Sequence, residues 1–209
     1  ESKIKKLLNE GPYYNRSSGT CFVGYNNVTE PCDFSNSGMT ESAKNLIDNV
    51  TWNTAAILTE GQNISNNTLE LYNYERGFRV GRNCTLGMYC NDTIERTTTW
   101  VGKIGLIYPS NYGYATSGGR TKSRDTCLET PLSNWNQEEL SNCQENNWLL
   151  SKEKAKYTMA PFSKNSNFII ALSINGQAFP NSSSTAVDDA LLIYPSLYLK
   201  ENVKIINGQ

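Results

Sequence analysis

The stretch "WVGKIGLIYPSNYGYATSGG", residues 100–119, holds the clearest strand in the middle of the chain and a loop of small residues and tyrosines. Ile104, Leu106 and Tyr108 share one face of the strand, which is rich in β-branched and aromatic residues. Pro109 then ends the strand, Ser110 can cap a short helix, and the following glycines, Gly113, Gly118 and Gly119, let the chain turn. We expect a corner of the fold here. The alternative is a binding loop in which Tyr112 and Tyr114 stack on a sugar or peptide.

The segments around this stretch predict an α+β fold. Helical spacing is present in residues 1–9 and again from Met39 to Val50, whereas alternation in residues 68–74 favours a strand. Residues 167–179 read as a hairpin that turns near Asn175 and Gly176. A last strand should place its apolar side chains on one face: Leu191, Ile193, Leu197 and Leu199. Pro195 indicates that this strand either is interrupted there or lies at the edge of a sheet. We expect residues 1–9 to be the end of a truncated helix and residues 10–209 to form one domain.

The composition excludes several classes of function. The chain has 209 residues and a net charge of −1, too small a field to attract nucleic acid or an anionic membrane. It has no histidine, which excludes Ser-His-Asp triads, Cys-His pairs and histidine metal sites. No long apolar run or export leader is present, and removal of a leader that preceded Glu1 is the open alternative. We therefore expect no cofactor and no enzyme activity, with carboxylate-only chemistry as the surviving exception.

Six cysteines predict disulfides in an oxidising compartment, because none lies in the close C-x-x-C spacing of zinc ribbons or thioredoxin-type sites. Six cysteines can pair in about 15 ways, and the sequence does not choose among them. We favour neighbours, each pair closing a short loop: Cys21 with Cys32, Cys84 with Cys90, and Cys127 with Cys143.

Three segments together resemble a known group of proteins. "WVGKIGLIYPSNYGYAT" (100–116), "WLLSKEKAKYTMAPFS" (148–163) and "IYPSLYLKENVKIINGQ" (193–209) are similar to surface domains of Gram-positive bacteria related to the C-type-lectin-like (sulfatase-modifying-factor-like) fold. The resemblance implies a compact mixed fold in which the terminal strands meet and long loops carry any binding. Its members often carry a type IV prepilin helix, which suits residues 1–9. Tyr194 differs from the sequence pattern of this group, in which arginine usually stands at the position before Pro195.

Candidate binding residues are few. Asp188 and Asp189, with Asn175 or Asn181, have oxygen ligands that could hold calcium, but we favour a solvated acidic turn. Trp135 is either a platform for a ligand or, as we favour, part of the core. The remaining tryptophans are expected to be buried: Trp52, Trp100 and Trp148.

Two functions follow as expectations. The first is an exported cell-surface structural protein, the head domain of a pilin-like subunit, whose partners are other surface or pilus subunits. The second is an adhesin-type module that recognises a glycan or a host protein through the 110–150 loops. In both, the location is extracellular, nucleic acid is not a partner, and the membrane is contacted only through a removed N-terminal helix.

Overall fold

The computed structural model describes residues 3–22, 28–53, 66–75, 78–79, 90–93, 99–119, 122–137, 141–161, 168–182 and 191–204. The chain divides into two compact units. Unit 1 contains residues 1–52, 100–105 and 195–209, and unit 2 contains residues 53–99 and 106–194. The chain passes between the units at four points, so neither unit is a continuous segment. Both contain helices and short antiparallel strands, which confirms the α+β class. One domain over residues 10–209 remains a prediction.

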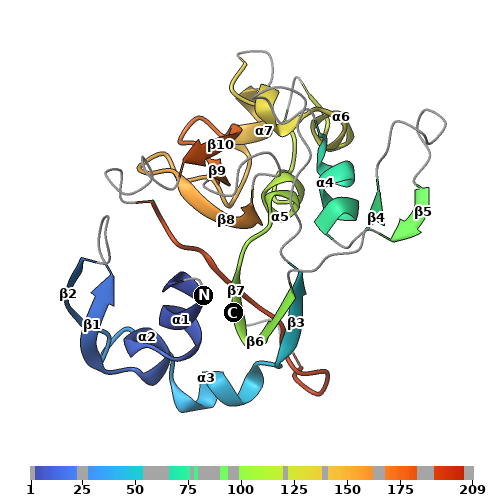
Figure 1. The fold of residues 1–209 in the computed structure, drawn as a ribbon. Coiled ribbons are helices and arrows are strands. Elements are labelled where there is room, and N and C mark those ends of the chain that lie inside the picture. Colours follow the sequence, from blue (N-terminus) through green and yellow to red (C-terminus); the bar gives the residue numbers. More distant parts are fainter. Residues whose placement is uncertain are drawn as a thin grey trace. The chain divides into compact units, whose positions relative to one another are not determined.

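Unit 1 is built from short elements (Figure 1). Its helices are α1 (Lys3–Asn9), α2 (Pro12–Asn15) and α3 (Glu41–Leu46). Its strands form three pairs, in which β1 (Ser18–Phe22) joins β2 (Thr29–Asp33), β3 (Val50–Asn53) joins β6 (Thr99–Gly102), and β7 (Ile104–Leu106) joins β11 (Pro195–Leu197). Three of these strands extend one residue past the division between the units: β3, β6 and β7.

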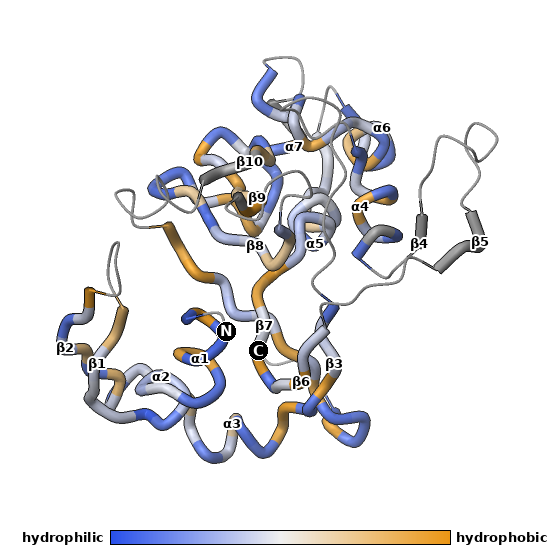
Figure 2. Tube along the Cα trace, in the orientation of Figure 1, coloured by the Kyte–Doolittle hydropathy of each residue, from blue (hydrophilic) through white to orange (hydrophobic). Residues whose placement is uncertain are grey.

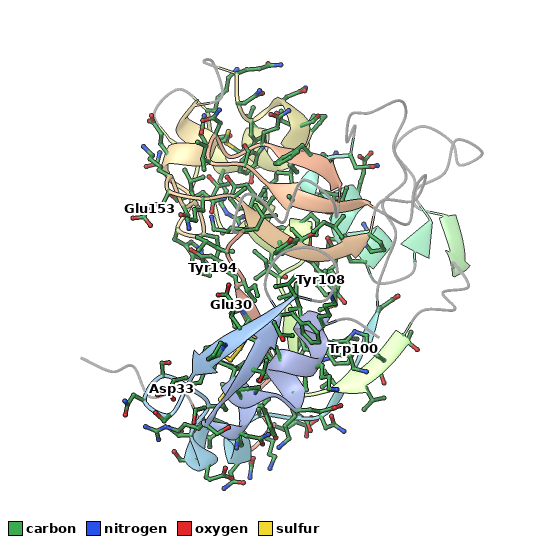
Figure 3. All side chains as sticks on the ribbon, turned by 60° about the vertical axis from the view of Figure 1, so that its left-hand side comes forward. Glu30, Asp33, Trp100, Tyr108, Glu153 and Tyr194 are labelled. Atoms are coloured by element: carbon green, nitrogen blue, oxygen red, sulfur yellow. A yellow bond between two sulfur atoms is a disulfide. The ribbon has the colours of Figure 1, made fainter. Side chains whose placement is uncertain are left out.

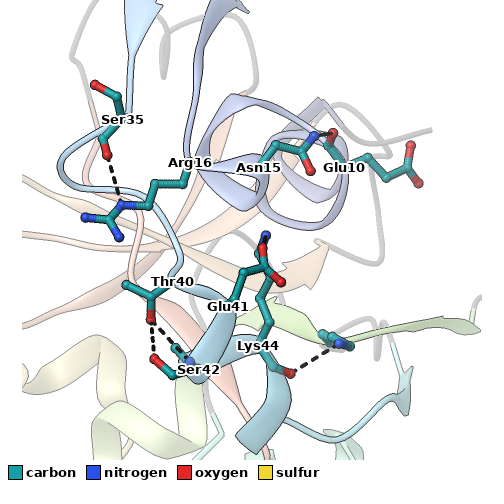
Figure 4. Close-up of polar contacts among 10 residues, drawn as sticks. Glu10, Asn15, Arg16, Ser35, Thr40, Glu41, Ser42 and Lys44 are labelled. Carbon is teal, nitrogen blue, oxygen red and sulfur yellow. Dashed lines mark hydrogen bonds and ion pairs between the residues drawn. The ribbon is translucent and has the colours of Figure 1, made fainter.

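The hairpin of β1 and β2 contains the first predicted disulfide. Cys21 and Cys32 form a disulfide with their Cα atoms 5.7 Å apart. Beyond the hairpin, Arg16 adopts the left-handed backbone conformation, with φ of 51°, and its Nε donates to the carbonyl of Ser35 at 2.9 Å (Figure 4). This contact holds the two ends of the hairpin close to α2.

The helix predicted from Met39 to Val50 is shorter in the structure. Its start is as expected, because Thr40 Oγ1 accepts from the backbone N–H of Ala43 at the N-cap. The helix ends at Leu46, whose carbonyl accepts from Lys200, and Ile47 bridges to Leu199. The C-terminal segment therefore takes the backbone groups that a longer helix would have used.

A side chain of α1 organises the strand region of unit 1. Asn9 Oδ1 accepts from the backbone N–H groups of Lys103 and Ile104 at 2.9 and 3.0 Å, and its Nδ2 donates to the carbonyl of Ile104 at 2.8 Å. Trp52 is buried, and its Nε1 donates to the carbonyl of Gly102 at 2.9 Å. The strand expected within residues 100–108 is divided at Lys103, and these contacts stabilise the turn between its two halves.

Unit 2 contains a helical part and a small sheet (Figure 1). The helices are α4 (Thr68–Glu75), α5 (Pro109–Tyr114), α6 (Arg124–Glu129), the 3-10 helix η1 (Leu132–Asn134) and α7 (Ser141–Glu145). A three-stranded antiparallel sheet has the order β10 (Ala178–Ser182), β9 (Phe168–Leu172), β8 (Lys156–Pro161). A separate antiparallel pair joins β4 (Phe78–Arg79) and β5 (Cys90–Thr93).

The strand expected over residues 68–74 is wrong, since this segment forms α4. Asn67 Oδ1 accepts from the N–H of Glu70 at 3.0 Å, and Glu70 Oε2 accepts from the N–H of Asn67 at 2.9 Å. This reciprocal pair is a capping box, a signal for a helix start that the alternating pattern obscured. Capping and packing against α5 therefore decide the local structure.

The core of unit 2 lies between the sheet and the helices. Figure 2 shows hydrophobic residues along β9 and along the segment after β7. The expected hairpin is confirmed, with Gly176 at a φ of 74° in the turn between β9 and β10. The buried cluster includes Ile170 and Leu172 on β9, Tyr112 on α5, Trp135, and the disulfide of Cys127 and Cys143.

The last strand differs from its expectation. β11 is three residues long and begins at Pro195, while Leu197 and Leu199 are exposed by 39% and 40% instead of facing a core. The resemblance implies that the terminal strands meet, but among the described strands β1 pairs with β2, and β11 pairs with β7 from the middle of the chain.

Candidate functional site

The stretch after β7 forms a tightly packed corner. The backbone N–H of Tyr108, the N-cap residue of α5, donates to Asn111 Oδ1 at 2.8 Å. Ser110 does not cap the helix as expected. Its hydroxyl and its backbone N–H both donate to the buried carboxylate of Glu75, the N–H at 2.9 Å. The anion at the start of α5 is stabilised by these donors, so Ser110 links α5 to α4.

Close packing explains the glycine in this corner. A Cβ added at Gly113 would stand 2.2 Å from Thr68 Oγ1 and 2.5 Å from its methyl carbon. Both distances are shorter than real contacts, so α4 and α5 approach each other here through a glycine. The interpretation of residues 109–114 as a fold corner accounts for these contacts.

Two of the predicted ligand-binding aromatics lie in the core. Tyr112 and Trp135 are both 0% exposed, and their ring centroids are 5.6 Å apart. The carbonyl of Tyr112 accepts from Asn147 Nδ2 at 2.7 Å, and burial raises the pKa of the Tyr112 hydroxyl. Neither ring can stack on a ligand from solvent in this structure. Core packing, the interpretation we favoured for Trp135, agrees with its burial.

Tyr114, the third predicted aromatic, is half-buried at the surface of unit 2. Its ring makes an edge contact with Tyr72 at 5.7 Å, and the guanidinium of Arg124 lies 5.8 Å from its centroid. Arg124 also donates to the carbonyls of Thr116 at 3.1 Å and Tyr114 at 3.3 Å. Tyr114 is thus held by its neighbours and is half-buried.

Trp148 is the residue that sequence reasoning missed. Burial was expected, but its side chain is 79% exposed, more than any other large hydrophobic residue among those described. It stands in a turn in which the N–H of Leu150 donates to the carbonyl of Asn147 at 3.0 Å. Large aromatic side chains in water are typical of recognition surfaces. The preceding Asn146 and Asn147 are turn-forming residues, and this signal could have indicated the exposure.

The turn under Trp148 is firmly anchored. Asn147 is 5% exposed and Leu149 is 8% exposed, so the residues on either side of Trp148 point inward. Asn147 Oδ1 accepts from the N–H of Leu149 at 2.9 Å. The N–H of Trp148 donates to the carbonyl of Ala115 at 3.3 Å, beside Tyr114. We call residues 147–150 the Trp148 turn.

The Trp148 turn is also tied to the second confirmed disulfide. Cys127 and Cys143 are bonded and fully buried. The carbonyl of Cys143 accepts from Thr116 Oγ1 at 2.6 Å, and the carbonyl of Asn146 accepts from the N–H of Ser117 at 3.1 Å. These bonds connect the segment before Trp148 to the end of α5. Because these bonds already hold the backbone of the turn, binding through Trp148 costs little further backbone entropy.

The calcium site remains a prediction, because most of its candidate residues are outside the described part of the chain. Asp188 and Asp189 lie outside the described residues, as does the side chain of Asn181, and Asn175 is exposed in the hairpin turn. Among the residues that the structure describes, no three acidic, cysteine or histidine side chains gather as metal ligands would. The predicted bond between Cys84 and Cys90 also falls outside them, because Cys84 and the side chain of Cys90 are not described.

Unit 1 has exposed apolar side chains at the end of α3 and on the C-terminal segment, Leu46, Leu197, Tyr198 and Leu199, which we call the apolar surface of unit 1. These side chains are 39–50% exposed. The N–H of Asp48 donates to the carbonyl of Tyr198 at 2.8 Å, so the C-terminal segment is fixed beside the end of α3. The Tyr198 ring lies 5.4 Å from that of Trp52, which in turn stacks on Trp100 at 5.8 Å. Within this set, Tyr198 therefore packs against an aromatic pair.

Lys156 is an unexpected polar group in unit 2. It is 0% exposed on β8, and its Nζ has no hydrogen-bond partner among the described residues. The Nζ lies 5.0 Å from the ring centroid of Tyr194, which is labelled in Figure 3. Tyr194 is the position at which the resembling proteins usually have arginine. Burial lowers the pKa of this amine from 10.5 to about 8. No pattern in the sequence distinguishes Lys156 from the exposed lysines before it.

Two general findings bear on location. The two disulfides fit an oxidising environment. In the described part of the chain, no helix has the length and apolar character needed to cross a membrane.

No known protein family matches this chain, and no curated protein or solved structure is significantly similar to it.

Proposed function

We propose that this chain is an extracellular, non-enzymatic binding module whose Trp148 turn contacts a carbohydrate. The 79% exposure of Trp148 on an anchored turn carries the proposal. An indole ring stacks on the apolar faces of sugar rings, and a preformed support limits the entropy lost on binding. The turn lies within residues 110–150, the region in which the sequence predicted binding. The residues predicted there were Tyr112, Tyr114 and Trp135, not Trp148.

The surroundings of Trp148 favour a sugar over an extended apolar partner. Asn146 and Ser117 are exposed and polar, and the backbone bond to Ala115 places the turn beside Tyr114. Hydroxyl and amide groups next to an aromatic face can bond the hydroxyls of a sugar while the ring covers its C–H groups. A host protein bound at the same turn is the alternative that the experiment must separate.

The test is a glycan array followed by titration calorimetry with the best glycan. We expect saturable binding by the wild-type chain and a loss of affinity of at least about tenfold in Trp148→Ala, because a central aromatic contact is removed. Ile174→Ala is the matched control, since Ile174 is an exposed apolar residue of unit 2 in another turn. Absence of any saturable glycan binding, or equal affinity in Trp148→Ala and the wild type, contradicts the proposal.

A second candidate function is a structural subunit of a pilin-like surface assembly, as the resemblance implies. The apolar surface of unit 1 favours it, because exposed apolar side chains are suited to contact other subunits. Sedimentation at increasing protein concentration tests it, with Tyr198→Ser as the variant that should reduce association. A chain that stays monomeric at all concentrations and binds glycan through Trp148 supports the binding module alone.

The finer fold assignment belongs to the same proposal. We infer a C-type-lectin-like domain of a Gram-positive surface protein from the three resembling segments, residues 100–116, 148–163 and 193–209. The pairing of β11 with β7 differs from the meeting of terminal strands that the resemblance implies. An experimental structure of the full chain decides the assignment.

A further inference from the structure

Unit 2 contains a buried amine that the proposed binding function does not use. Lys156 occupies an inward position on β8, where the other inward residues are Thr158 and Ala160. Thr158 satisfies its hydroxyl by donating to the carbonyl of Ile170 at 2.6 Å. Lys156 has no such bond, since its Nζ lacks a hydrogen-bond partner among the described residues. A charged ammonium in this position loses its hydration without compensation from an anion of the described residues.

One extended segment covers this amine. Residues 191–194, which we call the strap, run beside β8 in a parallel bridge between Lys156 and Leu192. The N–H of Leu192 donates to the carbonyl of Ala155 at 2.8 Å, and the N–H of Tyr157 donates to that of Leu192 at 3.0 Å. A third bond, from the N–H of Ile107 to the carbonyl of Tyr194, measures 3.3 Å. The strap is thus held by a few backbone bonds and by the Tyr194 ring over Lys156.

The groups that face the amine offer little charge compensation. The strap contributes Tyr194, whose ring face attracts a cation at 5.0 Å. Leu172 is the residue of β9 paired with Lys156, and it is apolar. Tyr157, the next residue on β8, is half-buried, and its pKa is raised by burial, so it remains neutral near pH 8. Protonated Lys156 therefore meets one aromatic ring and otherwise neutral surroundings among the described residues.

We propose that Lys156 and Tyr194 form a pH-sensitive latch, in which deprotonation of the amine tightens the strap on β8 and protonation loosens it. When the strap leaves β8, the amine reaches water and regains its hydration. The open state therefore binds the proton more tightly than the closed state, and the closed state gains stability as the pH rises. The aromatic ring of Tyr194 moderates the effect, because it stabilises the protonated form in the closed state.

The size of the effect follows from the two protonation equilibria. The amine has a pKa of about 8 in the closed state and an ordinary value of 10.5 when it is exposed. The opening equilibrium constant of the strap should therefore fall about tenfold between pH 6.5 and pH 9. Above the ordinary pKa no further change is expected, because both states are then neutral.

Hydrogen exchange of the full chain, read by mass spectrometry, tests the latch. The quantity measured is the protection factor of the strap and of residues 155–159, corrected for the intrinsic pH dependence of exchange. We expect it to rise about tenfold between pH 6.5 and pH 9 in the wild type and to stay constant in Lys156→Met, which keeps the apolar stem of the side chain. Lys154→Met, a nearby exposed lysine, is the control and should behave as the wild type.

Further variants separate titration of Lys156 from titration of nearby carboxylates. Tyr194→Leu should move the change in protection to lower pH because the closed state then holds the proton less tightly, whereas Tyr194→Phe should leave it in place. Asp188 and Asp189 precede the strap in the sequence and lie outside the described residues, so the double Asn variant is also measured. A flat profile in the wild type, a slope that persists in Lys156→Met, or a slope that depends on the two aspartates overturns the proposal.

Discussion

Removal of the buried disulfide of unit 2 should cost more stability than removal of the disulfide in the hairpin. The perturbation is Cys127→Ala with Cys143→Ala, compared with Cys21→Ala and Cys32→Ala. The two bonds join residues 16 and 11 positions apart. On the chain-entropy estimate, each bond stabilises the folded chain by about 3 kcal/mol, because closing loops of these lengths restricts the unfolded chain to a similar extent.

Burial separates the two variants. Cys127 and Cys143 are both 0% exposed inside the core, whereas Cys21 and Cys32 are half-buried on a surface hairpin. Two buried sulfur atoms replaced by hydrogen leave a small cavity, which adds roughly 1–2 kcal/mol. We therefore expect a loss of about 4–5 kcal/mol for the pair in unit 2 and about 3 kcal/mol for the pair in the hairpin.

Urea denaturation followed by circular dichroism measures both losses, with a separate fit to each transition where two are seen. The reasoning is refuted if the unit 2 variant loses less free energy of unfolding than the hairpin variant, or less than about 1 kcal/mol in total. A second readout comes from Trp135, because it lies in the same buried cluster as Cys127 and Cys143. Acrylamide quenching of tryptophan fluorescence in that variant should show more quenchable fluorescence as Trp135 loses its packing.

Two further substitutions test the packing and capping of α4. Gly113→Ala should lower the free energy of unfolding by about 1–3 kcal/mol, because the new methyl group overlaps Thr68. In a Thr68→Ala background the loss should be smaller, and a double-mutant cycle with no coupling would exclude this contact as the cause. Glu70→Ala removes one side of the capping box with Asn67 and should cost about 1 kcal/mol in urea denaturation. An unchanged midpoint would mean that packing alone holds α4.

Local signals in the sequence predicted several elements correctly. The short hairpin, the disulfide of Cys21 and Cys32, and that of Cys127 and Cys143 follow from short spacings along the chain. The turn at Gly176 follows from a glycine that adopts a positive φ without strain. These features involve residues close in sequence, so composition and spacing carry the relevant information.

The errors share a physical cause. α4 was predicted as a strand because its apolar residues alternate, but the helix is stabilised by its cap and by contact with α5. α3 ends early because the distant C-terminal segment bonds to Leu46 and Ile47. In both cases partners remote in sequence contribute: the C-terminal segment bonds to the end of α3, and α5 packs on α4 in addition to its local cap.

The candidate site divides in the same way. From the sequence alone, the absence of histidine, the near-zero net charge and the cysteine spacing restrict the chemistry, and the 110–150 region is marked as a candidate for binding. The tertiary structure alone decides which aromatic side chains reach water: Tyr112 and Trp135 are enclosed and Trp148 is not. It also decides that Lys156 lies under Tyr194 without an anion among the described residues. Exposure and charge compensation depend on surfaces that meet only when the chain is folded, and a linear pattern does not contain them.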